Sequence, residues 1–141
     1  MTGVQTCALP IYPQQDPSQP AQNLRMKMTT GADGAFRFTT VRPAPYTVPY
    51  DGPVGELLRA GGRHAWRPAH FHFIVSAAGC RPVVTELFPA DDPWLAEDAV
   101  FGVREPLIVA FRRVEDGADA ASHGLKAPYF DVEFDFRLAR I

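Results

Sequence analysis

The sequence predicts an all-β domain, a β-sandwich of mostly antiparallel strands joined by long loops. Short segments in which apolar and polar residues alternate recur about every ten residues, which is typical of strands with one buried face. The chain also has 14 prolines and 11 glycines, which favour turns, and 10 phenylalanines, which favour strands. We count five or six strand segments where a sandwich of this kind has about seven, so we expect its first strands to be missing.

Size and charge narrow the class of protein further. The 141 residues suffice for one core, and 46% apolar with 21% charged residues are ordinary values for a globular domain. A net charge of −2 gives no reason to expect nucleic acid or an anionic membrane as a partner. No apolar run is long enough to span a bilayer. Cys7 and Cys80 do not make a disulfide framework, so we expect a cytoplasmic protein.

Residues 1–11 are predicted to be a non-native leader. Within them, residues 3–11 read GVQTCALPI, which resembles the translation of a common sequencing-adapter tail. The segment lacks the basic start and the longer apolar run of a signal peptide. The natural gene would then continue upstream of a join at residues 11 and 12, and residues 12–141 are expected to form a partial β-sandwich domain.

The first half of this domain alternates between strands and rigid loops. Residues 23–30 and 35–41 carry alternating apolar side chains on either side of a glycine-containing turn, which predicts a β-hairpin. Four prolines make residues 42–53 a stiff extended loop. A short helix is expected over residues 54–60, ended by a pair of glycines.

Residues 68–76 have the strongest strand pattern of the chain. Two phenylalanines and Val75 occupy one face, while His70, His72 and Ile74 occupy the other. Further strands are expected over residues 81–88, 107–113 and 129–138, with an acidic loop at 89–98 and a polar loop at 115–126.

His70 and His72 are candidate metal ligands. Side chains two residues apart in a strand lie on the same face, about 7 Å apart, so the two imidazoles can share one ion. A pair of histidines that are only hydrogen-bonded is the alternative, since three or four ligands are usual. No cysteine lies nearby, which disfavours structural zinc, and the nearest carboxylates in the sequence are Asp51 and Glu86.

Two tyrosines in loops, Tyr12 and Tyr46, offer a different kind of donor. A phenol with a pKa of about 10 ionises at neutral pH only when a strong Lewis acid holds the phenolate. This hard anionic donor suits Fe(III) better than Zn(II) or Fe(II). An Fe(III) centre can chelate an aromatic 1,2-diol and make the diol itself reactive towards O2.

Six short motifs follow one another along the chain: DGPVG at residues 51–55, GRH at 62–64, WRPAHFHF at 66–73, TELF at 85–88, DPWL at 92–95 and DAVFGVR at 98–104. Together they resemble the intradiol ring-cleavage dioxygenases. The resemblance implies a non-haem Fe(III) enzyme on a β-sandwich, with two tyrosine and two histidine ligands, that uses O2 to cleave an aromatic 1,2-diol between its hydroxyls. It also implies that residues 12–141 are part of the catalytic domain of such an enzyme.

The resemblance assigns the iron ligands residue by residue. His70 and His72 match the two histidines, and Tyr46, 24 residues before His70, matches the tyrosine that stays on the iron. Tyr12 matches the first tyrosine, which leaves the iron and accepts a proton from the substrate. Tyr50 stands where the family usually has a small or polar residue, so it is left out of the ligand set as a surface or pocket-rim side chain.

The resemblance also assigns the surroundings of the substrate. Arg67 matches a pocket arginine that stabilises negative charge developing on the substrate. Glu86 falls where the family usually has a glutamine beside that arginine. A carboxylate at this position is expected to pair with Arg67 and weaken its action, so both residues are expected to line the substrate site.

The choice of substrate rests on finer similarities. Trp66 and the run at residues 98–103 look more like hydroxyquinol dioxygenases than catechol or chlorocatechol enzymes. The first expectation is therefore conversion of benzene-1,2,4-triol to maleylacetate, and the alternative is cleavage of catechol or chlorocatechol to a cis,cis-muconate. Such enzymes share an N-terminal helical domain that dimerises, so a homodimer is expected of the full-length protein. A non-catalytic β-sandwich binding module is the alternative from another class.

Overall fold

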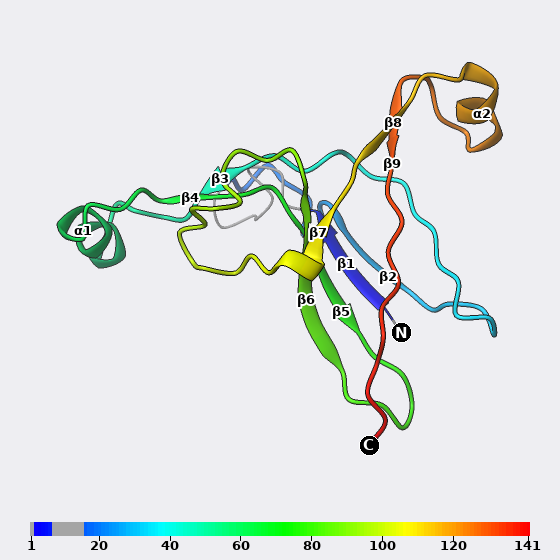
Figure 1. Ribbon diagram of the computed structural model, residues 1–141, viewed down its shortest axis with the longest axis horizontal. Helices are drawn as coiled ribbons and strands as arrows, with labels where there is room; N and C mark the ends of the chain where they lie inside the picture. The colour runs from blue at the N-terminus through cyan, green and yellow to red at the C-terminus, as the bar shows by residue number, and fades with distance from the viewer. Residues whose placement is uncertain (1, 7–15) are drawn as a thin grey trace.

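The computed structural model describes residues 2–6 and 16–141 (Figure 1). Its main feature is a five-stranded sheet in the order β2-β1-β5-β6-β7, in which only β6 and β7 run parallel. The strands of this sheet are β1 (Thr2–Thr6), β2 (Arg25–Met28), β5 (Phe71–Val75), β6 (Val83–Pro89) and β7 (Ile108–Val109). The prediction of a mostly antiparallel all-β fold is therefore confirmed.

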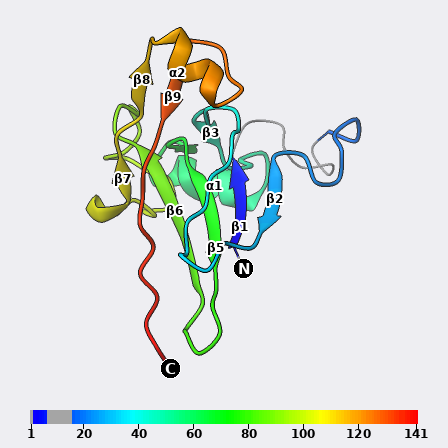
Figure 2. The same ribbon diagram turned by 90° about the vertical axis from the view of Figure 1, so that its right-hand side faces the viewer.

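Two short ladders and two short helices complete the described chain. One ladder joins β3 (Tyr46–Thr47) to β4 (Trp66–Arg67), and the other joins β8 (Arg112–Val114) to β9 (Tyr129–Asp131). The helical elements are α1 (Pro53–Ala60), α2 (Gly117–Ser122) and the 3-10 turn η1 (Glu105–Leu107). Helix α1 lies at one end of the molecule, whereas α2 lies at another with β8 and β9 (Figures 1 and 2). Over the described residues, neither helix has the length and apolar character needed to cross a membrane.

Strand β1 lies between β2 and β5, so part of the predicted leader belongs to the sheet. Thr2 pairs with Met28 on one side and with Val75 on the other. Ladder hydrogen bonds are made by the backbone, and a segment without alternating side chains can therefore add a strand to a sheet. Strand pairing does not test where residues 1–11 come from, so their non-native origin stays a prediction.

The β5–β6 hairpin divides the molecule into a core face and a polar face. Phe71, Phe73 and Val75 are buried, while Ile74 between them is 52% exposed, as the alternation predicted. The buried cluster is Phe71, Phe73, Val75, Leu87 and Val109, and partly buried side chains from residues 36–38, 107–111 and 132–138 pack against it. The core is therefore built on one strand pair and completed by segments that are distant in the sequence.

The expected hairpin over residues 23–30 and 35–41 is wrong in its second strand. The turn itself forms, since the Gly34 N–H donates to the Gly31 carbonyl over 3.1 Å. After the turn the chain runs extended and packs Phe38 edge-on against Phe71 and against Phe73, with ring centroids 6.3 Å apart in each pair. A lone two-stranded hairpin is only marginally stable, so burying these aromatic rings on the core is favoured over pairing with β2.

The two strands expected near the C-terminus are shorter than predicted. Residues 107–113 divide into β7, which pairs with β6, and β8, which pairs with β9. The break falls at Phe111, whose ring stacks on Phe71 with centroids 5.8 Å apart. Residues 129–138 begin as β9, but from Val132 onwards they pack side chains on the core without joining a ladder. Aromatic packing therefore sets the path of both segments.

One helix was expected and one was not. Helix α1 matches the expected helix over residues 54–60, with Pro53 in its first turn, where a missing N–H costs nothing. Helix α2 falls in the segment that was expected to be a polar loop. The Asp116 side chain accepts from the Ala118 N–H over 2.8 Å and so caps α2. At six residues, α2 is too short to show a helical period.

A pair of substitutions tests the division of β5 into two faces. Phe73→Ala removes a ring that is 2% exposed and touches the rings of Phe38, Phe71 and Phe136, so it should lower the free energy of unfolding by about 3–5 kcal/mol or abolish cooperative unfolding. Ile74→Ala, on the exposed face next to it, should cost about 1 kcal/mol or less. Urea unfolding followed by circular dichroism measures both. Equal losses would contradict the assignment of the faces.

Candidate functional site

The β3–β4 ladder brings Tyr46 to the histidine segment. Tyr46 pairs with Arg67, and the Val48 N–H continues the pairing with the Ala65 carbonyl over 2.9 Å. Opposed residues of an antiparallel pair place their side chains on the same face. The Tyr46 ring consequently lies beside the His70 ring, with centroids 5.5 Å apart.

The loop that carries Tyr46 is fixed by α1. Arg59 donates to the Tyr50 carbonyl over 3.1 Å, and Gly55 of α1 lies directly against the same peptide. A Cβ atom at Gly55 would lie 1.7 Å from the Tyr50 carbonyl oxygen, so only glycine fits there. The sequence motif DGPVG is thus a packing device that holds the tyrosine loop in place.

His70 is buried as a neutral imidazole. It is 1% exposed and packs on the Phe88 ring, with centroids 5.8 Å apart. Burial lowers the pKa of His70, which favours the uncharged ring. Its Nδ1 lies 2.9 Å from the Pro68 carbonyl, an acceptor only, so Nδ1 carries the proton and Nε2 keeps its lone pair. Metal-binding histidines have this arrangement.

His72 lies in β5, whereas His70 immediately precedes that strand. His72 is half-buried, and it lies directly opposite Glu86 in the β5–β6 ladder. His70 Nε2 lies 3.5 Å from the Glu86 carboxylate, so both histidines lie next to Glu86.

Arg67 is held between two carboxylates. Its Nε and Nη2 donate to Asp98 over 3.0 and 3.2 Å, and its Nη1 and Nη2 donate to Glu86 over 3.1 and 2.8 Å. Burial lowers the pKa of Arg67, but the hydrogen bonds to the two carboxylates outweigh burial and raise it above its ordinary value. The expected pairing of Glu86 with Arg67 is observed. Nη1 also lies 3.4 Å from His70 Nε2.

Sequence reasoning missed Asp98. Its side chain is buried and accepts hydrogen bonds from the Gly102 N–H over 2.8 Å and the Val100 N–H over 3.2 Å, besides those from Arg67. An aspartate that accepts from the backbone two and four residues later is typical of an Asx turn. The signal was present in the DAVFG run, but nothing in the sequence pointed from that run to Arg67.

The predicted site residues fall into three groups. Tyr46, Arg67, His70 and Glu86 lie together, and His72 lies opposite Glu86 in the β5–β6 ladder. Tyr50 is 52% exposed, in keeping with a residue outside the ligand set. Tyr12 lies outside the described residues.

The donor set decides which metal these residues fit. Within residues 2–6 and 16–141, no group of three or more His, Cys, Asp or Glu side chains is placed to bind a metal ion. Tyr46 would add a phenolate oxygen to a centre at His70 and His72, since its ring lies beside that of His70. Neutral imidazole and phenolate together suit Fe(III), so the residues present fit the iron expected from the sequence.

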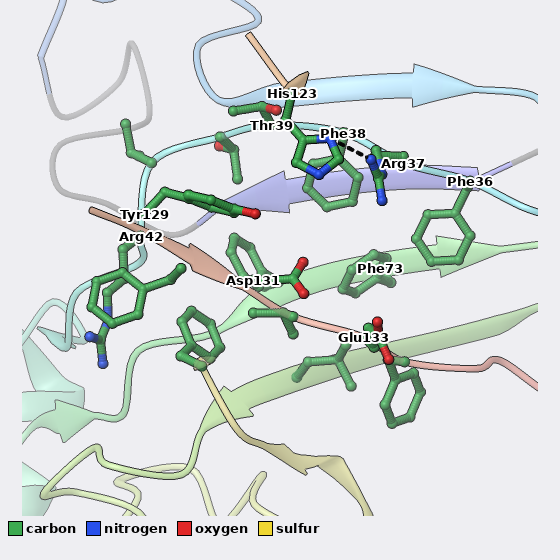
Figure 3. Close-up of a pocket in the computed structure, with 18 of the residues that line it drawn as sticks. Phe36, Arg37, Phe38, Thr39, Arg42, Phe73, His123, Tyr129, Asp131 and Glu133 are labelled. Atoms are coloured by element: carbon green, nitrogen blue, oxygen red, sulfur yellow. Dashed lines mark hydrogen bonds between the residues drawn. The ribbon is translucent and has the colours of Figure 1, made fainter. Parts of the chain in front are cut away.

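A cavity of about 630 Å³ lies elsewhere, between the core phenylalanines and the extended segments that cover them (Figure 3). Phe36, Phe38 and Phe73 line it, and the dashed line in Figure 3 joins Arg37 to His123 at its rim over 2.8 Å. Neither Tyr46 nor the histidine pair contributes to it. This cavity leads into the hydrophobic core and is separate from the candidate metal site.

The fold agrees with the comparisons to known proteins. The chain belongs to the family described as "Dioxygenase", which matches residues 5–140. Within that family it resembles the intradiol ring-cleavage dioxygenases, as the sequence motifs indicated, and the hydroxyquinol 1,2-dioxygenases in particular.

Three relatives show how far the similarity extends. Hydroxyquinol 1,2-dioxygenase from Rhizobium sp. (strain MTP-10005) is 51% identical over 128 residues, which are 90% of this chain and 43% of that protein. The structure of hydroxyquinol 1,2-dioxygenase from Pseudomonas putida DLL-E4 matches with a TM-score of 0.86 at 43% identity, over 99% of this chain and 50% of that one. Catechol 1,2-dioxygenase from Acinetobacter sp. ADP1, inhibited by bound mercury, matches with a TM-score of 0.92 at 33% identity, over 99% of this chain and 46% of that one. The chain thus spans about half the length of these relatives.

The charged cluster around Arg67 predicts a stability that depends on pH. Burial raises the pKa of Asp98, but its hydrogen bonds, above all those from Arg67, outweigh burial and lower it. A carboxyl whose pKa is lower in the folded state stabilises the fold above its unfolded-state pKa of about 4, and this stability is lost as the pH falls through the folded value. Asp98→Asn should therefore lower the free energy of unfolding by about 1–3 kcal/mol at pH 7, and the difference from wild type should shrink below about pH 4.

Urea unfolding at pH 7 and at pH values below 4 measures this difference. Asp91→Asn is the matched control, because Asp91 also pairs with an arginine, Arg42, but is 63% exposed and its pair is screened by water. A difference between Asp98→Asn and wild type that stays constant with pH would contradict the prediction.

Proposed function

We propose that this chain contributes the catalytic site of an intradiol ring-cleavage dioxygenase, which binds Fe(III) through Tyr46, His70, His72 and Tyr12. The observation that carries the proposal is the contact between the Tyr46 ring and the buried, neutral His70. The phenol and the imidazole come from residues 24 positions apart, and the two-residue β3–β4 ladder brings them together. The family match over residues 5–140 supports the same function.

The bound Fe(III) would hold the aromatic diol as a chelated dianion and draw electron density from its ring, which makes the ring reactive towards O2. The protein residues then have separate tasks. His70 presents Nε2 because the Pro68 carbonyl fixes its other nitrogen. Tyr12 accepts a proton from a substrate hydroxyl. Arg67 supplies a fixed positive charge next to His70 that stabilises negative charge developing on the substrate.

The substrate that we propose is hydroxyquinol, benzene-1,2,4-triol, which would be cleaved to maleylacetate. The 51% identity to a hydroxyquinol 1,2-dioxygenase supports this choice, as do Trp66 and the run at residues 98–103. Catechol is the second candidate, because the chain also matches the structure of a catechol 1,2-dioxygenase with a TM-score of 0.92.

For the whole protein we propose a cytoplasmic homodimer. The lack of a disulfide framework supports a reducing compartment, and Cys80 is free. The dimer is carried over from the resemblance to full-length relatives.

Loading with iron tests the ligand set. The chain purified with Fe(III) should be red-brown, because a tyrosinate bound to Fe(III) gives a charge-transfer band in the visible range. Tyr46→Phe should remove or strongly shift that band, as measured by absorption and resonance Raman spectroscopy. Tyr50→Phe is the matched control. It removes the same hydroxyl from a tyrosine that lies four residues after Tyr46 and is 52% exposed, so the band should not change. A colourless iron-loaded chain would favour the binding module.

Oxygen uptake tests the substrate. The iron-loaded protein should consume O2 faster with benzene-1,2,4-triol than with catechol at equal concentrations. An oxygen electrode measures the rates, and product analysis distinguishes maleylacetate from cis,cis-muconate. Faster uptake with catechol would overturn the choice of hydroxyquinol while leaving the reaction class intact.

A further inference from the structure

We propose that Asp98 is a positioning residue that sets where the guanidinium of Arg67 lies, so that one N–H of Nη1 stays directed at the metal side of the site. The geometric part of this inference stands on the contacts of Arg67 alone. Its catalytic consequence rests on the proposed function.

The hydrogen bonds of Arg67 account for each of its five N–H groups. Asp98 takes the Nε–H and one Nη2–H, and Glu86 takes the other Nη2–H and one Nη1–H. The remaining Nη1–H faces His70 Nε2 over 3.4 Å, longer than any of the four bonds to carboxylates. It is therefore the one donor of Arg67 that is not committed to a carboxylate, and it lies at the nitrogen that would bind the metal. A substrate oxygen beside the metal can receive this N–H without displacing either carboxylate.

Asp98 is the more rigid of the two partners. It is 3% exposed, and two backbone N–H groups of its own turn fix its carboxylate. The turn is also hydrogen-bonded to β4, since the Ala99 N–H donates to the Trp66 carbonyl over 3.0 Å. Arg63 adds contacts to the carbonyls of Asp98 and Ala99. The Asp98 carboxylate is thereby fixed relative to the strand that carries Arg67.

Gly102 closes the turn against the guanidinium. A Cβ atom at this position would lie 2.9 Å from Arg67 Nη2, 3.0 Å from Asp98 Oδ2 and 3.2 Å from Glu86 Oε2. All three atoms belong to the charged cluster, and each is held by other hydrogen bonds. The turn from Asp98 to Gly102 therefore fits the guanidinium so closely that a single methyl group must displace it.

Glu86 by itself would not fix Arg67 in this position. Glu86 lies on β6 and contacts the other edge of the guanidinium. Its side chain is 19% exposed, whereas that of Asp98 is 2% exposed. With Asp98 lost, the Nε edge of the guanidinium has no partner and the group can turn about its contacts with Glu86. Asp98 therefore governs position, whereas Glu86 mainly adds a second negative charge.

Asp98→Asn is the first test, on the iron-loaded chain. Whichever way the amide is turned, its NH2 faces an N–H of Arg67 and also a backbone N–H, that of Val100 in one orientation and that of Gly102 in the other, and all of these groups are donors. We expect kcat to fall about 100-fold, in line with the effect of misplacing a catalytic group by about 1 Å, with a smaller change in KM. Iron content and the visible band should be unchanged, because the Asp98 carboxylate accepts its hydrogen bonds from Arg67 and from the backbone of its own turn. Asp91→Asn, at an exposed arginine pair, should leave kcat unchanged.

Gly102→Ala is the second test, and it keeps every charge of the cluster. The added methyl should displace the guanidinium and lower kcat at least about tenfold with the iron band retained. Gly117→Ala is its control, because a Cβ there meets nothing within 4 Å. If Asp98→Asn fails to fold, Gly102→Ala decides the proposal.

A measurement without iron separates this proposal from the proposed function. In ¹⁵N spectra of the metal-free chain, the Arg67 Nε–H, identified by its absence in Arg67→Lys, should be protected from solvent exchange. The protection should be lost in Asp98→Ala, which leaves the Nε–H without its acceptor, and kept in Asp91→Asn. Loss of protection together with lower kcat and an intact iron band supports the proposal. Wild-type kcat in both Asp98→Asn and Gly102→Ala, or a protected Nε–H in Asp98→Ala, overturns it. If the iron-loaded wild type shows neither colour nor turnover, the proposed function fails, and the Nε–H exchange alone decides the position of Arg67.

Discussion

The alternation of side chains along β5 is the constraint on which fold and site both depend. Because successive residues of a strand face opposite sides, the same five residues build the core with Phe71, Phe73 and Val75 and present His72 on the other side. A slip of the strand by one residue would bury the histidine and expose the phenylalanines. Core packing therefore fixes the register of β5, and this register also decides on which face His72 lies.

The second layer of the molecule is made by packing more than by ladders. Residues 35–41 and 132–138 run extended over the core and contribute phenylalanines to it, yet neither belongs to the five-stranded sheet. The Phe73 and Phe136 rings, 4.8 Å apart, show how closely these segments approach the sheet. A layer of this kind is held by the packing of aromatic rings, whereas a β-ladder would be held by backbone hydrogen bonds. Regular alternation in the sequence predicts burial of one face equally well in both cases.

The site is electrostatically different from the rest of the molecule. Arg67 carries one positive charge between two carboxylates, so the cluster has a net charge of −1 next to a neutral His70. Burying these charges is costly, and the cost is offset only while each charged group keeps its hydrogen bonds. A glutamine in place of Glu86 would leave the cluster neutral. Glu86 therefore gives the cluster its net negative charge beside the candidate metal centre.

The sequence by itself determined the strand class, the central hairpin and most of the candidate site. Alternation predicted β5 and β6, spacing predicted two histidines on one face, and the motifs indicated Tyr46, Arg67 and Glu86. These features are local, or they are carried by residue types in a fixed order. Only the tertiary structure decided that residues 35–41 leave their hairpin, that residues 107–113 change partner at Phe111, and that Asp98 reaches Arg67 from 31 residues away. Each of these outcomes is a competition between contacts distant in the sequence, and no local pattern encodes which contact is favoured.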